Sequence, residues 1–381
     1  MPELFPFVPL AAGSEALGWL TDVLPSRTSE QRIKLRSVPR QSFQYAFKLG
    51  SDQFSKAKAF ARRNGAEPVL VPVWAEHTLI SGAILGSASS IDFDASAADY
   101  RVGGEILIWE RDDKAVTATI AAIAPTGVTL TAAIGMDFQR PTVSPVRRAW
   151  IVDGLRSTRR RGLETDGTIR FEVTDNIDLS GAAVYPLYQG LEVLTEPTER
   201  VSDISENIVR ATEYVDNGFG AVAIEATKNY ADFGQTIGFL AIGKAALWHR
   251  RRFLHNRKGK QKPFWLPSFS NDLQLQAAIG AADAVLTVRS IAPTGAYLGR
   301  HVMIELKNGT RFFREIINAF AVGGGNDQLT ISTALGQAVA PADIAWLCFL
   351  SRVRLNSDSV TISYRFRGVF SVSAPVIEVP A

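Results

Sequence analysis

The side chains best suited to catalysis or metal binding are few and widely spaced in this chain. It has four histidines and one cysteine, Cys348, among 381 residues. His77 follows Glu76, and Asp92 and Asp94 come in the next segment, so a metal or acid–base site is one interpretation. The chain has no His-x-His, HExxH or paired-cysteine spacing, which favours a solvated strand end instead. We therefore expect no catalytic residue, no metal site and no cofactor.

Other catalytic patterns give little support for an enzyme. No G-x-S-x-G elbow occurs, and the glycines at 323–325 have no Lys-Ser/Thr after them, so they predict a flexible turn and not a phosphate loop. A pair of carboxylates for glycoside hydrolysis stays open, because only their separation in space matters. Exposed aromatic residues such as Tyr100 and Trp109 would favour sugar binding, whereas their burial would oppose it.

Basic residues gather in two short segments. The first holds Arg250, Arg251, Arg252, Arg257, Lys258 and Lys260, and the second holds Arg159, Arg160 and Arg161. Such clusters either bind DNA phosphates or dock on acidic protein surfaces. We predict protein–protein interfaces here, and nucleic acid is the alternative.

The N-terminal segment is rich in proline and phenylalanine and has no periodicity. Phe5 and Phe7 lie in it, so it either forms an arm on a neighbouring subunit or caps its own domain. Glu3 stands where a signal peptide would be basic, and no apolar run of 18 residues follows, so we expect a soluble protein made in the cytoplasm. Residues 371–381 predict a terminal strand that an interface could share.

Composition and patterning predict a mainly β fold. Lys plus Arg exceeds Asp plus Glu by only three, which is far from the balance of a dedicated nucleic-acid binder. Turn signals at 111–114, 125–127 and 165–167 separate the short alternating segments. The predicted strands cover residues 43–49, 69–74, 105–109, 116–120, 128–132 and 169–173. One helix is expected from Ser51, ending in a left-handed residue at Asn64-Gly65.

Several motifs recur at an offset near 195 residues. P-x-x-x-P-x-aromatic occurs at 68–74 and 263–269, and each copy follows a helix with a basic end, at 57–64 and at 244–257. Further matches join 104–109 with 300–305, 128–135 with 329–336, and 168–173 with 360–366. These ordered matches predict an internal duplication.

The duplication predicts two tandem domains, each with one flanking helix and an inserted small β-barrel. The first domain comprises residues 1–77 and 153–195, with a barrel at 78–152. The second comprises residues 196–271 and 352–381, with a barrel at 272–351.

The order of motifs over residues 17–76 resembles the start of tail-tip proteins of long-tailed bacteriophages. In that family a W-x-T-D-V-L segment, here at 19–24, precedes an E-Q-R-I-x-L-R strand at 30–36 and a P-R-x-x-F strand at 39–43. A helix and a strand ending in P-x-W follow, as at 69–74. The second half is similar only through the repeat, since residues 206–209 read Glu-Asn-Ile-Val.

The resemblance implies a distal tail or baseplate-hub protein built on tail-tube-like β-sandwich or barrel domains. It would be a structural component of the virion tail tip that joins the tail tube to the baseplate or central fibre. Its partners would be the tail tube protein, the tape measure protein, and other baseplate and fibre proteins. Genome DNA would be a partner only in transit, because a strongly cationic lumen would hold a genome that must slide through it. A trimer would present six similar domains to the tube, and a hexamer is the alternative. A sugar- or receptor-binding module and a cell-wall hydrolase are the competing classes.

Overall fold

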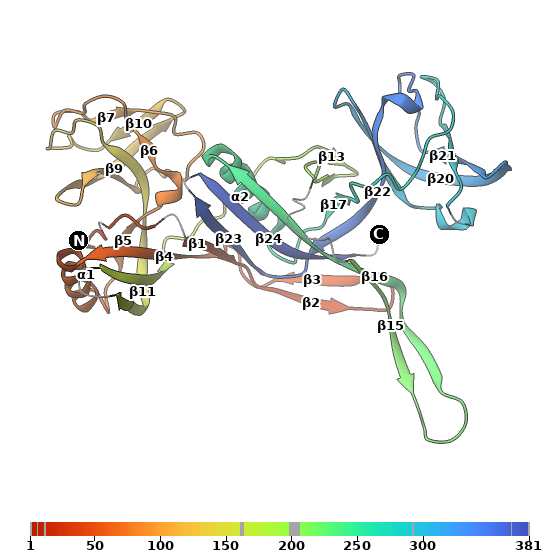
Figure 1. Cartoon of the computed structure of the whole chain (residues 1–381), viewed down its shortest axis with the longest axis horizontal. Coiled ribbons are helices and arrows are strands. Elements are labelled where there is room, and N and C mark those ends of the chain that lie inside the picture. The colour runs from red at the N-terminus through yellow and green to blue at the C-terminus, as the bar shows by residue number, and fades with distance from the viewer. Residues whose placement is uncertain are drawn as a thin grey trace.

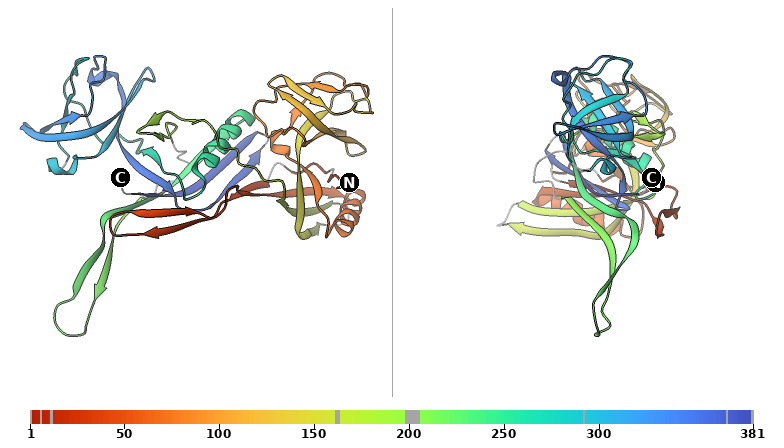
Figure 2. Two further views of the ribbon diagram at one scale, coloured as in Figure 1. Left: turned by 180° about the vertical axis from the view of Figure 1, so that it is seen from behind. Right: turned by 90° about the vertical axis from the view of Figure 1, so that its right-hand side faces the viewer.

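A computed structural model describes residues 2–5, 7–10, 13–160, 164–197, 206–291, 293–366 and 368–379. Over these residues the chain is mainly β, as predicted, with two α-helices among its many strands. The molecule is elongated (Figure 1): a curved central sheet carries one β-module above each end, and a long hairpin projects below one end. Figure 2 shows the same hairpin standing clear of the sheet in two further views.

The first half of the sheet is built from residues before and after an insertion. Its elements are β1 (Gly13–Gly18), β2 (Thr21–Pro25), β3 (Glu30–Lys34), β4 (Arg40–Gly50), α1 (Ser51–Arg63), β5 (Val69–Pro72), β11 (Thr142–Arg160) and β12 (Glu164–Val173). Hydrogen bonding gives the order β5, β11, β12, β4, β1. Phe43, Tyr45 and Phe47 alternate inward along β4, and α1 covers them with Phe54 and Phe60.

The second half repeats this order. Its elements are β15 (Glu206–Val215), β16 (Ala223–Ile242), α2 (Lys244–Arg257), β17 (Phe264–Pro267), β22 (Ile344–Leu355), β23 (Ser359–Phe366) and β24 (Val369–Glu378). β17 pairs with β22 as β5 pairs with β11, and β24 pairs with β16 as β12 pairs with β4. A short hairpin, β13 (Leu187–Tyr188) and β14 (Leu191–Glu192), lies in the connection between the halves.

Each half carries an insertion with its own hydrophobic core. The first insertion holds η1 (Trp74–Glu76), β6 (Thr78–Leu79), β7 (Ser90–Asp92), β8 (Glu105–Arg111), β9 (Lys114–Ala124) and β10 (Gly127–Leu130). The second holds β18 (Val285–Arg289), η2 (Thr294–Ala296), β19 (His301–Leu306), β20 (Arg311–Gly323), β21 (Asn326–Ile331) and η3 (Pro341–Asp343). β10 pairs with β7 and β9 as β21 pairs with β18 and β20. The two insertions also share a left-handed glycine after this strand, Gly135 at φ 78° and Gly336 at φ 79°.

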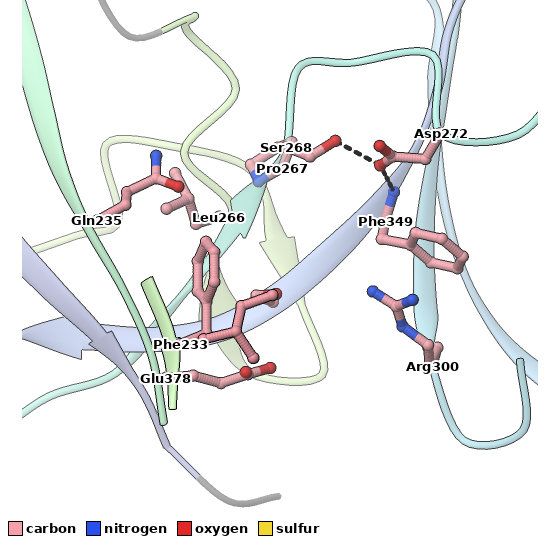
Figure 3. A pocket seen from close by; sticks show the side chains of 11 residues that line it. Phe233, Gln235, Leu266, Pro267, Ser268, Asp272, Arg300, Phe349 and Glu378 are labelled. Carbon is pink, nitrogen blue, oxygen red and sulfur yellow. Dashed lines mark hydrogen bonds between the residues drawn. The ribbon is translucent and has the colours of Figure 1, made fainter. Parts of the chain in front are cut away.

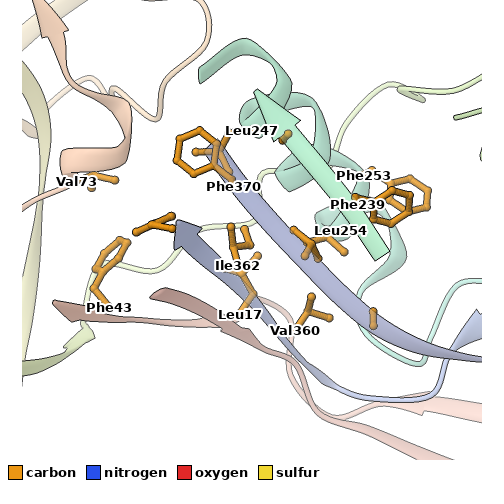
Figure 4. Packing of buried hydrophobic residues seen from close by; sticks show 14 of the residues in the cluster. Leu17, Phe43, Val73, Phe239, Leu247, Phe253, Leu254, Val360, Ile362 and Phe370 are labelled. Carbon is orange, nitrogen blue, oxygen red and sulfur yellow. The ribbon is translucent and has the colours of Figure 1, made fainter. Parts of the chain in front are cut away.

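The two halves share one core, because β1 pairs with both of them. β1 lies between β4 of the first half and β23 of the second, with Leu17 opposite Val360. Figure 4 shows Leu17, Val360 and Ile362 packed below α2, and Phe43 of the first half follows in the same layer. A single hydrophobic cluster therefore runs through both halves, while the cores of the insertions remain separate.

Three local predictions from the sequence are wrong. Residues 165–167 lie inside β12 and not in a turn. α1 ends without a left-handed residue, since Asn64 has φ −105° and its side chain caps the carbonyl of Phe60 instead. The counterpart of β12 is β24 and not residues 360–366, because β24 takes the place beside β16 that β12 takes beside β4.

Candidate assembly surfaces and the charge network beneath them

The basic segment of α2 faces the interior of the molecule. Arg250, Arg251 and Arg257 are buried, and each forms an ion pair with a glutamate. The prediction of a basic docking surface is therefore wrong for these three residues. Arg252, the other arginine of this segment, is half-buried and donates to the carbonyl of Ala182.

The C-terminal end of α2 is also tied to its own chain. Lys258 adopts a left-handed conformation at φ 54°, and its ammonium group lies 2.5 Å from the Asp178 carboxylate. The backbone N–H of Lys260 donates to Asp358. These two lysines thus anchor the end of α2 to the connection between the halves and to the bend before β23.

Arg251 is the centre of a network that joins three parts of the molecule. Its guanidinium lies 2.7 Å from Glu15 on β1 and also pairs with Glu76 at the base of the first insertion. Glu15 accepts further bonds from Gln41 and from Tyr364. Burial by itself would lower the pKa of Arg251, but Glu15 and Glu76 outweigh it and raise that pKa well above its usual range. The guanidinium therefore stays charged at all accessible pH values and holds β1, α2 and the insertion together.

A second set of charges continues the network into the first insertion. The backbone N–H of Asp99 donates to the Glu76 carboxylate. The Asp99 carboxylate pairs with the buried Arg147 and with Arg101. Burial would raise the pKa of Asp99, but these two guanidinium groups lower it below its usual value. The insertion is thereby fixed to the sheet by ionic contacts as well as by β11.

Histidine 255 is a buried neutral member of the α2 cluster. Burial, followed by the nearby Arg251, lowers the pKa of His255 to about 4. Its Nδ1 accepts a hydrogen bond from the backbone N–H of Leu179 at 3.1 Å, which requires that nitrogen to be unprotonated. The residue therefore orders the connection between the halves and does not act as a surface cation.

The N-terminal phenylalanines belong to the core of their own half. Phe5 and Phe7 are buried, and the Phe5 ring packs edge-on against Phe47, Phe60 and Phe171. The backbone of Phe5 bonds to Leu70 on β5. Of the two interpretations of this segment, capping of its own domain is the one that holds, and these residues do not form an arm on a neighbour.

The basic group on β11 is partly accessible. Arg159 is exposed and lies over the ring of Phe54 at 5.1 Å. Arg160 is the last residue of β11, whereas Arg161 lies outside the described residues. Arg156 and Arg148 are exposed on the same strand. This strand, and not α2, presents an accessible basic edge.

The residues that suggested chemistry in the sequence do not form a site. His77 bonds to the carbonyl of Trp74 at the end of η1, with Nδ1 2.6 Å from that oxygen. Within the described residues no group of three or more histidine, cysteine or acidic side chains could hold a metal ion. Tyr100 is buried, and the half-buried Trp109 packs edge-on against Trp74, so these two aromatics form no exposed sugar platform.

A cavity of about 240 Å³ lies where the second insertion meets the sheet. Figure 3 shows Arg300 and Asp272 on one side of it, with Glu378, Phe233 and Leu266 on the other. Asp272 is already used by its own surroundings, since it accepts bonds from the Ser268 hydroxyl and from the backbone N–H of Phe349. The Arg300 guanidinium stacks on the Phe349 ring at 3.4 Å. These polar groups thus stabilise the junction between the insertion and the sheet.

The accessible apolar surface is concentrated on the projecting hairpin of β15 and β16. Phe219 at its tip is 93% exposed and Ile208 at its base is 71% exposed. Among its described side chains, the hairpin also exposes Val209, Tyr214, Val215, Val222 and Ile224. A run of this kind on an isolated chain marks a protein-binding surface. Sequence periodicity does not reveal it, because the same residues would suit a buried strand.

Comparison with known proteins assigns no family to this chain. No protein-family model matches the chain, and no curated protein sequence is similar to it. Within the part of the chain that the structure describes, no helix is long and apolar enough to cross a membrane.

Proposed function

We propose that this protein is a structural, ring-forming component of a bacteriophage tail tip, either a distal tail or a baseplate-hub protein. In this role it joins the tail tube to the baseplate or central fibre and performs no catalysis. The motifs at residues 19–45 and 69–74 support the family, and the fold supports the architecture.

One observation carries the proposal: two halves with the same element order are joined edge to edge in one sheet. A chain of this kind presents two similar surfaces in succession, as neighbouring subunits of a tube do. Three copies arranged in a closed ring would therefore present six similar halves to a six-fold tube. Closed rings also satisfy the strand edges that one chain leaves open.

The insertions suit a role in attachment. Each has its own hydrophobic core and stands on the same side of the sheet (Figure 1). In a ring they would form a crown on one face, where fibre or baseplate proteins could bind. The burial of Tyr100, one of the two aromatic residues that favoured a sugar-binding module, counts against that alternative.

The test is assembly with tail proteins. The purified chain is imaged by electron microscopy alone and after mixing with the tail tube protein of the same virus. We expect rings that cap one end of each tube. A chain that remains single at high concentration and never joins a tube contradicts the proposal.

A further inference from the structure

We propose that β15 of one copy of this chain adds to the outer edge of residues 155–160 of β11 in a second copy. The hairpin of β15 and β16 then lies against the first half of that neighbour. This inference deepens the proposed function, because it names the partner and the junction, but it rests on strand pairings that are independent of any virus.

The template for this junction lies inside the chain, between the two halves. β1 pairs with β4 on one edge and with β23 on the other. The β2–β3 hairpin continues from β1 and reaches the second half, where the backbone N–H of Thr21 donates to Asp358 and Arg354 pairs with Glu30. The first half is thus joined to the second by one strand and one hairpin.

β15 is the counterpart of β1, but it lacks the second neighbour. It pairs with β16, and within the described chain its other edge meets no strand. An ungapped alignment at an offset of 191 places Glu206 on Glu15, Ile208 on Leu17 and Thr212 on Thr21. Leu17 is 1% exposed, with Val360 of β23 opposite it in the sheet and α2 packed above both (Figure 4), whereas Ile208 is 71% exposed. Ile208 therefore matches a core position whose neighbouring strand is missing.

The missing neighbouring strand is the counterpart of β23, which is the distal part of β11. β23 lies between β24 and β1, while residues 155–160 of β11 lie beside β12 and meet no other strand of the described chain. Strand pairing aligns Arg156 with Thr361, since their partners on β12 and β24 occupy matching places beside β4 and β16. The residues that precede them, Leu155 and Val360, are then aligned as well. The same offset of 205 aligns Asp153 with Asp358.

Transferring the internal pairing fixes the register between copies. Leu17 is opposite Val360, so Ile208 lies opposite Leu155 of the neighbour. Ala16 is opposite Thr361, so Asn207 lies opposite Arg156. Thr21 donates to Asp358, so the backbone N–H of Thr212 reaches Asp153. A shift by one residue would turn Ile208 away from the core, which specifies this register.

The distal part of the hairpin supports the same arrangement, because apolar residues there stand in place of the charged residues at the internal junction. Arg354 and Glu30 form a bidentate ion pair within the chain. The equivalent residue of Arg354 on β11 is Trp150, and that of Glu30 on the hairpin is Val222. Both are unusually exposed apolar side chains, at 42% and 41%. An ion pair at the internal junction is thus replaced by an apolar pair at the proposed one.

Charge is also complementary between the two surfaces. The hairpin exposes Glu213, Asp216 and Glu225, whereas β11 exposes Arg148, Arg156 and Arg159. Complementary charge steers two surfaces together and opposes the wrong partner. β15 and residues 155–160 of β11 lie at opposite ends of the molecule (Figures 1 and 2), so the contact between two copies is head-to-tail. Such contacts build rings when the rotation closes.

The first experiment is a cross-link between copies. The double variant Asn207→Cys with Arg156→Cys is oxidised and run on a non-reducing gel. We expect covalent multimers, because directly opposed strand residues lie close enough for a disulfide. The variant Asn207→Cys with Thr158→Cys, two residues out of register, and each single variant should stay at the mass of one chain. Linkage in the out-of-register pair alone contradicts the register.

The second experiment replaces the apolar pair at the junction by an ion pair. Val222→Glu and Trp150→Arg are each expected to raise the concentration for half-assembly by at least about tenfold. The double variant copies the internal Glu30–Arg354 pair and should restore assembly. Both positions are exposed in the single chain, so its unfolding curve should hardly change, which separates assembly from folding. Single variants that assemble like the wild type overturn the proposal, as does a double variant that assembles no better than either single variant.

The outcomes also separate this junction from the proposed function. Rings that persist in both single variants and show no cross-link overturn the junction but leave a ring-forming protein. A wild-type chain that never assembles overturns both.

Discussion

At the scale of single residues, the buried arginines of α2 matter for the integrity of the molecule. Arg251 bridges Glu15 and Glu76, which come from β1 and from the base of the first insertion. Removing one partner from such a buried pair leaves an uncompensated charge. The arginine therefore fixes the positions of parts that are far apart in sequence.

We expect Arg251→Ala to lower the free energy of unfolding by about 3–5 kcal/mol, because Glu15 and Glu76 lose their countercharge. Denaturant unfolding measures the change. The neighbouring Arg252→Ala is the matched control and should stay within about 0.5 kcal/mol of the wild type, since Arg252 is only half-buried and its bond to the Ala182 carbonyl is a long one of 3.3 Å. Equal losses in the two variants would contradict the network.

His255 predicts a dependence of stability on pH. Its pKa is about 4 in the folded chain against an ordinary value of 6.5, so below pH 6.5 the unfolded state binds a proton that the folded state does not. Stability should fall as pH drops from about 6.5 to about 4, by up to roughly 3 kcal/mol from this group. His255→Gln should reduce the dependence of the free energy of unfolding on pH over this window. The same substitution at the exposed His77 should leave that dependence in place.

The sequence could predict which residues are basic but not which way they face. The helix at 244–257 and its basic end follow from local pattern, and the structure has the helix at these residues. Its acidic partners do not, because Glu15 and Glu76 precede Arg251 by 236 and 175 residues. Phe5 and Phe7 posed the same problem, since an apolar segment without periodicity gives no sign of which surface it covers.

At the scale of elements, the bend between β22 and β23 is a close junction. Gly259 lies beside it at φ 64°, and a Cβ there would come within 3.2 Å of the Asp358 backbone and 3.0 Å of the Trp19 side chain. Asp358 in turn accepts bonds from Thr21 and Lys260. A glycine is required at this position for both its conformation and its contacts.

We expect Gly259→Ala to reduce stability by about 1–3 kcal/mol more than Gly309→Ala. Gly309 also has a positive φ, 87°, but a Cβ there would meet open space. The difference between the two variants, measured by thermal or denaturant unfolding, isolates the crowding from the conformational strain. Equal effects would show that the junction can relax without cost.

The repeated elements were largely predictable, and the exceptions have physical causes. Proline spacing placed β5 and β17, and the turn signals at 111–114 and 125–127 fall at the ends of β9. The counterpart of β12 was missed because β-branched segments follow one another in both β23 and β24, and pattern alone does not show which of them lies beside β16. Pairing in space decides that question.

At the scale of the whole molecule, one chain leaves two unlike strand edges open. If three copies close them as proposed, the assembly should have a mass near 125 kDa, three times the 41.5 kDa of one chain. Light scattering after size-exclusion chromatography measures this mass. Twice that value would indicate the hexamer instead, and a mass that grows with concentration would indicate an open filament.

The way the insertions are mounted has a mechanical consequence. β11 pairs with β8 of the first insertion and continues as one strand beside β5 and, with a bulge after Val152, beside β12. β22 likewise pairs with β19, β17 and β24. A pull on either insertion along its strand would load these ladders in shear, so many hydrogen bonds would have to break at once. Force applied to the crown would therefore pass into the sheet before any hinge could absorb it.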